Sequence, residues 1–113
     1  MNYILSSEFQ TVGKVNSVII NDQYFTVEYV DNLMIEGEVC EGGCWLSKRV
    51  IRLSTDLLNC SERHDRVLRH EIYHALIGLS GLTELMPDNV EEALCVMLES
   101  ASYLLNMEQR DAE

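Results

Sequence analysis

Positive charge is scarce in this chain, which limits the partners that the protein can take. Its 113 residues include 8 lysines and arginines against 19 aspartates and glutamates, and the formal net charge is −11. A surface this acidic repels phosphate backbones, so we expect no nucleic-acid partner. The same charge disfavours adsorption to anionic membranes and favours solubility.

Long hydrophobic runs are also missing. The longest apolar stretch, around residues 75–82, is short and is interrupted by Gly78, Ser80 and Gly81, so it predicts no membrane span. The N-terminal sequence MNYILSSEFQ lacks a basic segment followed by an apolar core, and a secretory signal is therefore not expected. We accordingly expect a cytoplasmic protein.

Internal repeats, low-complexity stretches and interdomain linkers are absent from the sequence as well. A length of 113 residues with 47% hydrophobic residues suits one folded domain over residues 1–113. Without an export signal, the four cysteines are expected to be free thiols. Cys40 and Cys44 flank EGG at 41–43, and a single C-x3-C pair is a weak metal signal.

The first half of the chain predicts a small sheet. β-Branched and aromatic residues dominate 17–20 and 24–30, and polar and apolar residues alternate in RVIRL at 49–53. Turn signals separate the runs: ND at 21–22, DN at 31–32 and EGG at 41–43. We expect a mostly antiparallel sheet built from hairpins.

The second half predicts two helices. Ser61 is suited to cap a helix that runs to about Leu79, where GLSGL ends it. Asp88 is suited to cap a second helix over about 89–108. That helix carries one apolar stripe: Val90, Ala93, Leu94, Met97, Leu98, Ala101, Leu104 and Leu105. Strands followed by helices indicate an α+β fold.

The first helix contains the pattern H-E-x-x-H. His70 and His74 lie four residues apart and therefore share one helix face, where both imidazoles can bind one ion. Glu71 lies about 100° further round the helix, within reach of a metal-bound water but not easily a ligand. This arrangement is typical of zinc hydrolases with a glutamate base. The alternative is that the three residues are ordinary polar positions on a helix.

A third metal ligand is needed, because catalytic zinc usually has three protein ligands and a water. The pattern H-E-x-x-H-x-x-G-x-x-H is excluded, because Ile77 and Ser80 occupy its last two fixed positions. His64 lies on another side of the helix. The second helix offers Glu91 at the edge of its apolar stripe and Glu92 pointing away from it. We expect Glu91 to be the ligand, with Glu92 as the alternative.

These residues resemble those of small gluzincin-type zinc metallopeptidases, in particular the ImmA/IrrE-like domains and related short phage-encoded enzymes. The resemblance covers roughly Arg49 to Leu105. It implies a minimal zincin-like fold and Zn²⁺ bound by His70, His74 and Glu91, with Glu71 as general base. It also implies that RVIRL is an edge strand beside the cleft, along which a protein or peptide substrate could bind.

One departure from the family pattern concerns Cys95. Many gluzincins have an acid or amide four residues after the glutamate ligand, where it supports a histidine, whereas this chain has Cys95 at that position.

Peptide hydrolysis would also need a hydrogen-bond donor to the oxyanion that forms on the scissile carbonyl, and Tyr73 and Tyr103 are the candidates. The alternatives to a metallopeptidase are a zinc-binding domain that binds a partner without cleaving it, and an acidic interaction protein without metal.

Overall fold

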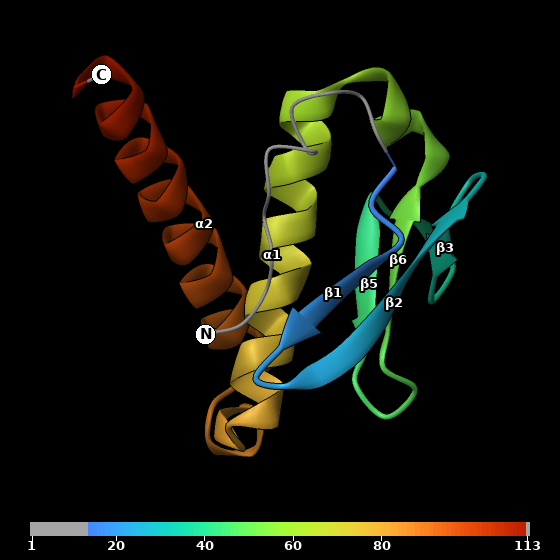
Figure 1. The fold of residues 1–113 in the computed structure, drawn as a ribbon. Helices are drawn as coiled ribbons and strands as arrows, with labels where there is room; N and C mark the ends of the chain where they lie inside the picture. Colours follow the sequence, from blue (N-terminus) through green and yellow to red (C-terminus); the bar gives the residue numbers. More distant parts are fainter. Residues whose placement is uncertain (1–13, 113) are drawn as a thin grey trace.

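The fold consists of a small sheet, a helix packed against one of its faces, and a second helix that crosses the first (Figure 1). The computed structural model describes the backbone of residues 14–112 and the side chains of residues 14–101. The strands, 3-10 helices (η) and α-helices follow in chain order: β1 (Ser17–Ile20), β2 (Gln23–Val30), β3 (Met34–Ile35), β4 (Glu38–Val39), β5 (Gly42–Trp45), β6 (Val50–Ser54), η2 (Thr55–Asn59), α1 (Ser61–Leu79), η3 (Leu82–Leu85) and α2 (Asp88–Ala112).

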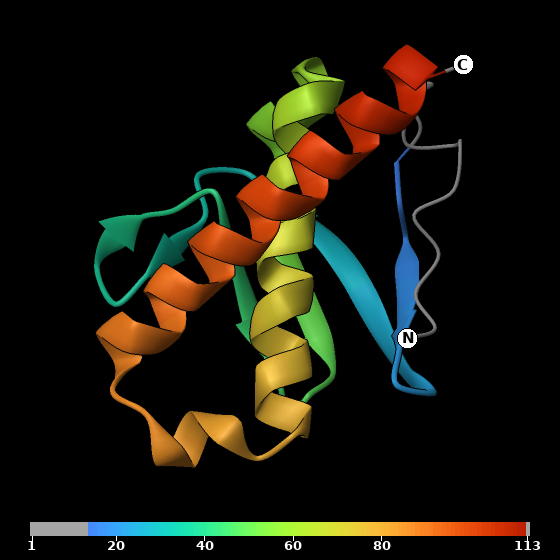
Figure 2. The same cartoon turned by 90° about the vertical axis from the view of Figure 1, so that its left-hand side faces the viewer.

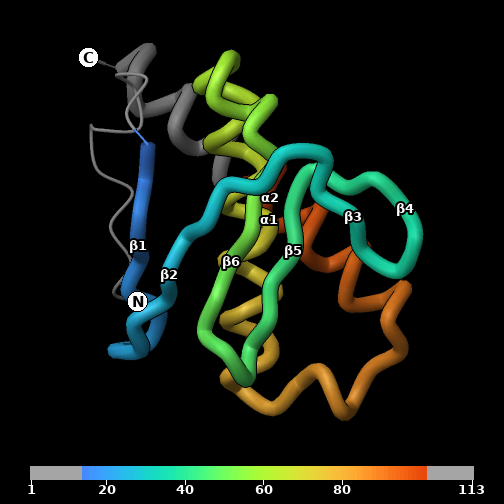
Figure 3. Tube along the Cα trace, turned by 90° about the vertical axis from the view of Figure 1, so that its right-hand side faces the viewer, coloured from blue at the N-terminus to red at the C-terminus, as the bar shows by residue number. Residues whose placement is uncertain are grey.

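The main sheet has four strands in the order β1-β2-β6-β5, and β3 and β4 form a separate two-stranded ribbon beyond β5 (Figure 3). The β1–β2 and β5–β6 pairs are antiparallel, and the central β2–β6 pair is parallel. Asn21 and Asp22 make the predicted turn between β1 and β2, with φ of 49° and 63°. The predicted α+β fold with a mostly antiparallel sheet is therefore confirmed.

Two predictions about the sheet are wrong. EGG does not form a turn, because Gly42 and Gly43 lie inside β5. RVIRL is not an edge strand either: β6 is internal, and β5 is the edge beside α1. A Cβ at Gly42 would lie 2.9 Å from Cγ1 of Val67, so glycine here permits close approach of β5 to α1. This glycine serves packing between a strand and a helix, which a local sequence pattern does not distinguish from a turn.

The hydrophobic core lies between the sheet and α1. Alternate residues of β1, β2 and β6 face the helix, as the period of two in a strand requires. The sheet contributes Val18, Ile20, Phe25, Val27, Ile51 and Leu53, and α1 contributes Val67, Leu68, Ile72 and Ala75. This packing fixes α1 on the sheet and leaves another face of the helix available for polar residues.

The predicted extent of α1 is confirmed, since the helix spans Ser61–Leu79. Its N-cap position is Cys60 rather than the expected Ser61, and no side chain caps it. The second helix begins at Asp88, which lies in its first turn rather than before it. Within the described residues, we find no helix that is both long and apolar enough to cross a bilayer.

The packed face of α2 differs from the predicted stripe. Leu94, Cys95 and Leu98 pack against α1 at Tyr73 and Ile77. From that contact α2 crosses α1 obliquely, and its C-terminal half diverges from the body of the protein (Figures 1 and 2).

Part of the predicted stripe stays in solvent. Val90 and Met97 are 47% and 59% exposed, and the side chains of Leu104 and Leu105 lie outside the described residues. Relative to the predicted stripe, α2 is therefore rotated about its own axis, so that the face that carries Glu91, Cys95 and Glu99 lies against α1. This rotation determines which acids of α2 meet the histidines of α1.

Candidate metal centre

The histidine pair of α1 faces the N-terminal half of α2. His70 and His74 lie one helical turn apart, with ring centroids separated by 4.9 Å. Their side chains are only 15% and 21% exposed. The core face of α1 is anchored on the sheet, so both rings are held at the boundary between α1 and α2. The predicted pairing of the two imidazoles on one helix face is confirmed.

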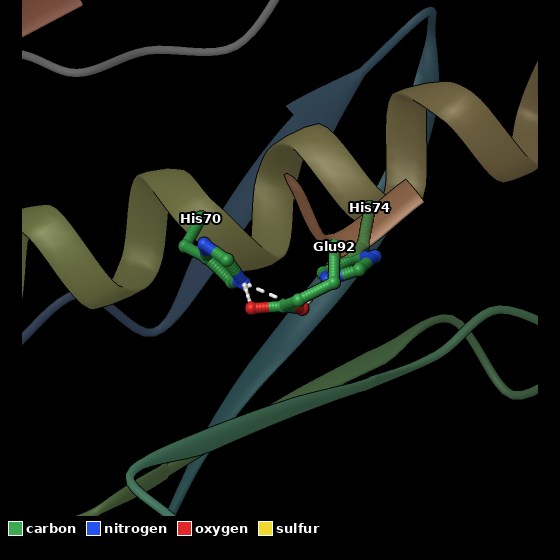
Figure 4. Close-up of side chains that lie close together, drawn as sticks. All are labelled: His70, His74 and Glu92. Carbon is green, nitrogen blue, oxygen red and sulfur yellow. Dashed lines mark hydrogen bonds and ion pairs between the residues drawn. The ribbon is translucent and has the colours of Figure 1, made fainter. Parts of the chain in front are cut away.

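Glu92 reaches across from α2 to both rings (Figure 4). Its Oε1 lies 3.2 Å from Nε2 of His70 and 3.0 Å from Nε2 of His74. One ligand atom from each of these three residues can be chosen so that all lie within 4.8 Å of one another. Donors around a tetrahedral zinc ion, at about 2.0–2.1 Å from it, lie roughly 3.4 Å apart. The distances of 3.2 and 3.0 Å from the carboxylate to the two imidazoles are close to this spacing, so these three side chains can hold a metal ion.

The opposite nitrogen of each histidine also meets a carboxylate. Glu91 Oε2 lies 2.6 Å from Nδ1 of His74, and Glu99 Oε1 lies 3.1 Å from Nδ1 of His70. Glu99 in turn lies 3.6 Å from Nε of Arg66. A carboxylate at Nδ1 favours the tautomer that carries the proton on Nδ1, which leaves the lone pair of Nε2 available to a metal ion. Both imidazoles are thus oriented with Nε2 toward the same point.

This placement differs from the sequence expectation for the third ligand. Glu91 was expected to face the metal and Glu92 to point away, but the carboxylate of Glu92 lies at the two Nε2 atoms and that of Glu91 at Nδ1 of His74. The cause is the rotation of the packed face of α2. Glu92 is still 57% exposed, which agrees with its position at the rim of the helix contact.

Glu99 was not considered from the sequence. It lies seven residues, or two helical turns, after Glu92, and therefore on the same face of α2. That spacing was available in the sequence as a signal. Glu99 makes the contact to a histidine that Cys95 is unable to make, because Cys95 is fully buried in the helix interface.

Glu71, the residue expected from the sequence to act as general base, is buried beside the two histidines. The residue is only 7% exposed, and burial raises its pKa to about 6, although the neighbouring His70 and His74 lower it. A carboxyl group that titrates near neutral pH can both accept and release a proton there. The absence of a side chain at Gly42 makes room for Glu71, because a Cβ at that position would lie 3.2 Å from its Oε2.

Two clefts flank Glu71. One, of about 480 Å³, lies on the His74 side between β5, the C-terminal part of α1 and η3. The other, of about 290 Å³, lies on the His70 side. Because Glu71 lines both clefts, a chain that occupied them together would pass directly over this carboxylate.

The remaining candidate groups take structural roles in the described residues. All four cysteines are free thiols, as expected. Burial and the nearby carboxylates raise the pKa of Cys44 and of Cys95 to about 12, so neither is a thiolate nucleophile at neutral pH. Tyr73 is buried against Cys95 in the helix interface, and the side chain of Tyr103 lies outside the described residues.

His64 takes no part in the metal centre. It is 4% exposed, and its Nε2 lies 2.8 Å from the hydroxyl of Tyr29.

Comparisons with protein families, with curated proteins and with solved structures found no match to this chain. A functional assignment therefore rests on the geometry of the centre itself.

Proposed function

We propose that this protein is a zinc-dependent metallopeptidase with a minimal zincin-like fold, similar to the gluzincin type. One observation carries the proposal: Glu92 meets Nε2 of both His70 and His74, while a carboxylate holds Nδ1 of each ring. Ordinary surface histidines need no such arrangement. The buried Glu71 beside them supplies the proton-transfer group that hydrolysis requires.

In this proposal His70, His74 and Glu92 hold the ion, and Glu91 and Glu99 orient the histidines. A bound zinc ion would polarise the scissile carbonyl and acidify a water molecule. Glu71 removes a proton from the attacking water and delivers it to the nitrogen of the leaving amine. Its raised pKa favours this two-way transfer, because the protonated and ionised forms are both accessible near neutral pH.

The substrate in this proposal is an extended peptide segment. In the described residues β5 pairs with β6, and no strand is hydrogen-bonded to its other edge; residues of β5 line both clefts. An extended chain can add to such an edge by main-chain hydrogen bonds, which do not depend on sequence. That arrangement would carry the scissile bond past Glu71.

The test combines metal content with peptide cleavage. Protein purified without added metal is analysed for zinc per chain, and a defined peptide mixture is searched by mass spectrometry for zinc-dependent cleavage. We expect about one zinc per chain, and Glu71→Gln should keep the zinc and lose cleavage. If wild type takes up no zinc on titration, the metal centre is refuted. If zinc binds but neither wild type nor Glu71→Gln cleaves any peptide, a zinc-binding interaction domain is the better description.

A further inference from the structure

The two clefts beside Glu71 differ in chemistry. The smaller cleft, on the His70 side, is lined by charged groups that include Glu41, Arg63 and Glu99. Glu41 and Arg63 form an ion pair there. The larger cleft, on the His74 side, has a wall of Ile35, Cys44, Trp45 and Leu46. Val67 and Val96 also line the smaller cleft, so a chain lying across the centre would meet the larger apolar surface on the His74 side.

The apolar wall of the larger cleft is preformed. A Cβ at Gly43 would lie 2.6 Å from Cδ1 of Ile35, and a Cβ at Gly78 would lie 2.8 Å from Cδ2 of Leu46. Both side chains thus lie directly against backbone, with no room to collapse further inward. The guanidinium of Arg52 lies 4.8 Å from the centre of the Trp45 ring, a cation–π contact that restrains the ring.

The same cleft also has acidic lining residues. Glu84 of η3 and Glu91 of α2 line it together with the apolar side chains. An acidic side chain would be repelled there, whereas an uncharged apolar side chain would lose water against the wall. A volume of about 480 Å³ exceeds that of one side chain and accommodates a large side chain with its adjoining backbone.

We propose that the larger cleft selects peptides that carry a large apolar side chain, aromatic or long aliphatic, next to the scissile bond on the His74 side. The inference rests on the proposed peptidase function, and it deepens that function by naming the substrate class. The occupant is an extended peptide rather than a free small molecule, because the two clefts share Glu71 and are both lined by neighbouring glycines of β5, Gly43 in the larger and Gly42 in the smaller.

Trp45 provides a direct readout, because it is the only tryptophan in the chain and lines the cleft. The probes are acetylated and amidated hexapeptides without tryptophan or tyrosine that differ at one central position, which is Phe, Leu, Ala or Asp. They are titrated into zinc-loaded Glu71→Gln protein, which should bind without turnover, while Trp45 fluorescence is recorded. We expect the Phe and Leu peptides to bind at least about tenfold more tightly than the Ala peptide and the Asp peptide most weakly. Equal affinities would overturn the proposal.

A matched pair of variants locates the binding. Ile35→Asn places an amide in the apolar wall, whereas Met34→Asn changes the neighbouring residue, which is 54% exposed and does not line the cleft. Ile35→Asn should remove most of the preference for Phe over Ala, and Met34→Asn should leave it unchanged. Ile35→Ala serves as a milder second variant if Ile35→Asn does not fold. Loss of the preference in Met34→Asn alone would contradict the assignment of the cleft.

The design separates this inference from the peptidase proposal. Fluorescence titration measures binding alone and is repeated on zinc-free protein. Zinc uptake and cleavage without a Phe preference would overturn only the cleft assignment. A Phe preference in protein that takes up no zinc and cleaves nothing would overturn only the peptidase. In the wild type, the preference should appear in kcat/KM for the same peptide series.

Discussion

Glu99 Oε1 lies 3.1 Å from Nδ1 of His70, across the contact between α2 and α1. Both side chains are 15% exposed, so water does not freely compete for this contact. On the other histidine, Glu91 Oε2 lies 2.6 Å from Nδ1 of His74. Carboxylate support for the two histidines therefore comes from one turn before and one turn after Cys95. The cysteine at that position does not leave the histidines without support.

The first prediction concerns these two supporting carboxylates. Glu99→Gln and Glu91→Gln should each weaken zinc affinity by about 10–100-fold, because an amide holds the Nδ1–H less firmly than a carboxylate. Competition with a chelator of known affinity measures the change. Cys95→Ala is the matched control, because it alters the same helix face without touching a histidine contact, and it should leave zinc affinity unchanged. An equal loss in Cys95→Ala would show that packing of α2, not the carboxylates, controls affinity.

The second prediction decides between the two candidate ligands on α2. Glu92→Gln should lower zinc affinity by clearly more than Glu91→Gln, because Glu92 lies at both Nε2 atoms and Glu91 lies at one Nδ1. The two variants change neighbouring residues by the same chemistry, so each controls for the other. A larger loss in Glu91→Gln would mean that the carboxylates exchange roles when the ion binds.

The difference between expectation and structure at this point has a physical cause. The histidine pair and the extent of α1 follow from local spacing, which a helix converts directly into geometry. The identity of the acids that meet the histidines depends on how α2 is rotated against α1. That rotation is set by packing at Leu94, Cys95 and Leu98, and the wider apolar stripe that includes Met97 does not specify it.

In the sheet, too, local sequence patterns predict some features and not others. Hairpin signals at 21–22 were sufficient to predict the β1–β2 turn. In contrast, β6 pairs in parallel with β2 and antiparallel with β5, and neither the parallel pairing nor the edge position of β5 is encoded in a local pattern. A pair of glycines is typical of a turn, but here Gly42 and Gly43 lie in β5. Because they have no side chains, neighbouring side chains can lie directly against the backbone of this strand.

The third prediction tests this use of Gly42. Gly42→Ala should lower the free energy of unfolding by about 1–3 kcal/mol, because its Cβ would lie 2.9 Å from Cγ1 of Val67. Val67→Ala removes that methyl group and is destabilising alone, but it should recover part of the loss when combined with Gly42→Ala. Urea denaturation of the two single variants and the double variant measures the coupling. Additive losses would show that the contact with Val67 does not limit this position.

A buried histidine outside the candidate metal centre leads to the fourth prediction. Burial lowers the pKa of His64 from its ordinary value of 6.5. The ring stacks on Tyr29 at a centroid distance of 5.8 Å, and its Nε2 lies 2.8 Å from the Tyr29 hydroxyl. That hydroxyl also donates to the carbonyl of Val15 at 2.9 Å. His64 thus belongs to a contact that ties Val15, two residues before β1, to β2 and to the first turn of α1.

Because the pKa of His64 is lower in the folded state, the unfolded chain binds this proton first as pH falls. The stability associated with the neutral ring is fully present above about pH 6.5 and is lost progressively as pH falls below that value toward the folded-state pKa. His64→Gln keeps a donor near the Tyr29 oxygen and removes the titration. The difference in unfolding free energy between wild type and this variant, measured in urea on metal-free protein, should be constant above pH 7 and should shift in favour of the variant toward pH 5. Tyr29→Phe retains the titrating ring and should keep the wild-type slope at lower stability. Parallel curves for wild type and His64→Gln from pH 7 to pH 5 would show that His64 is not held neutral by the fold.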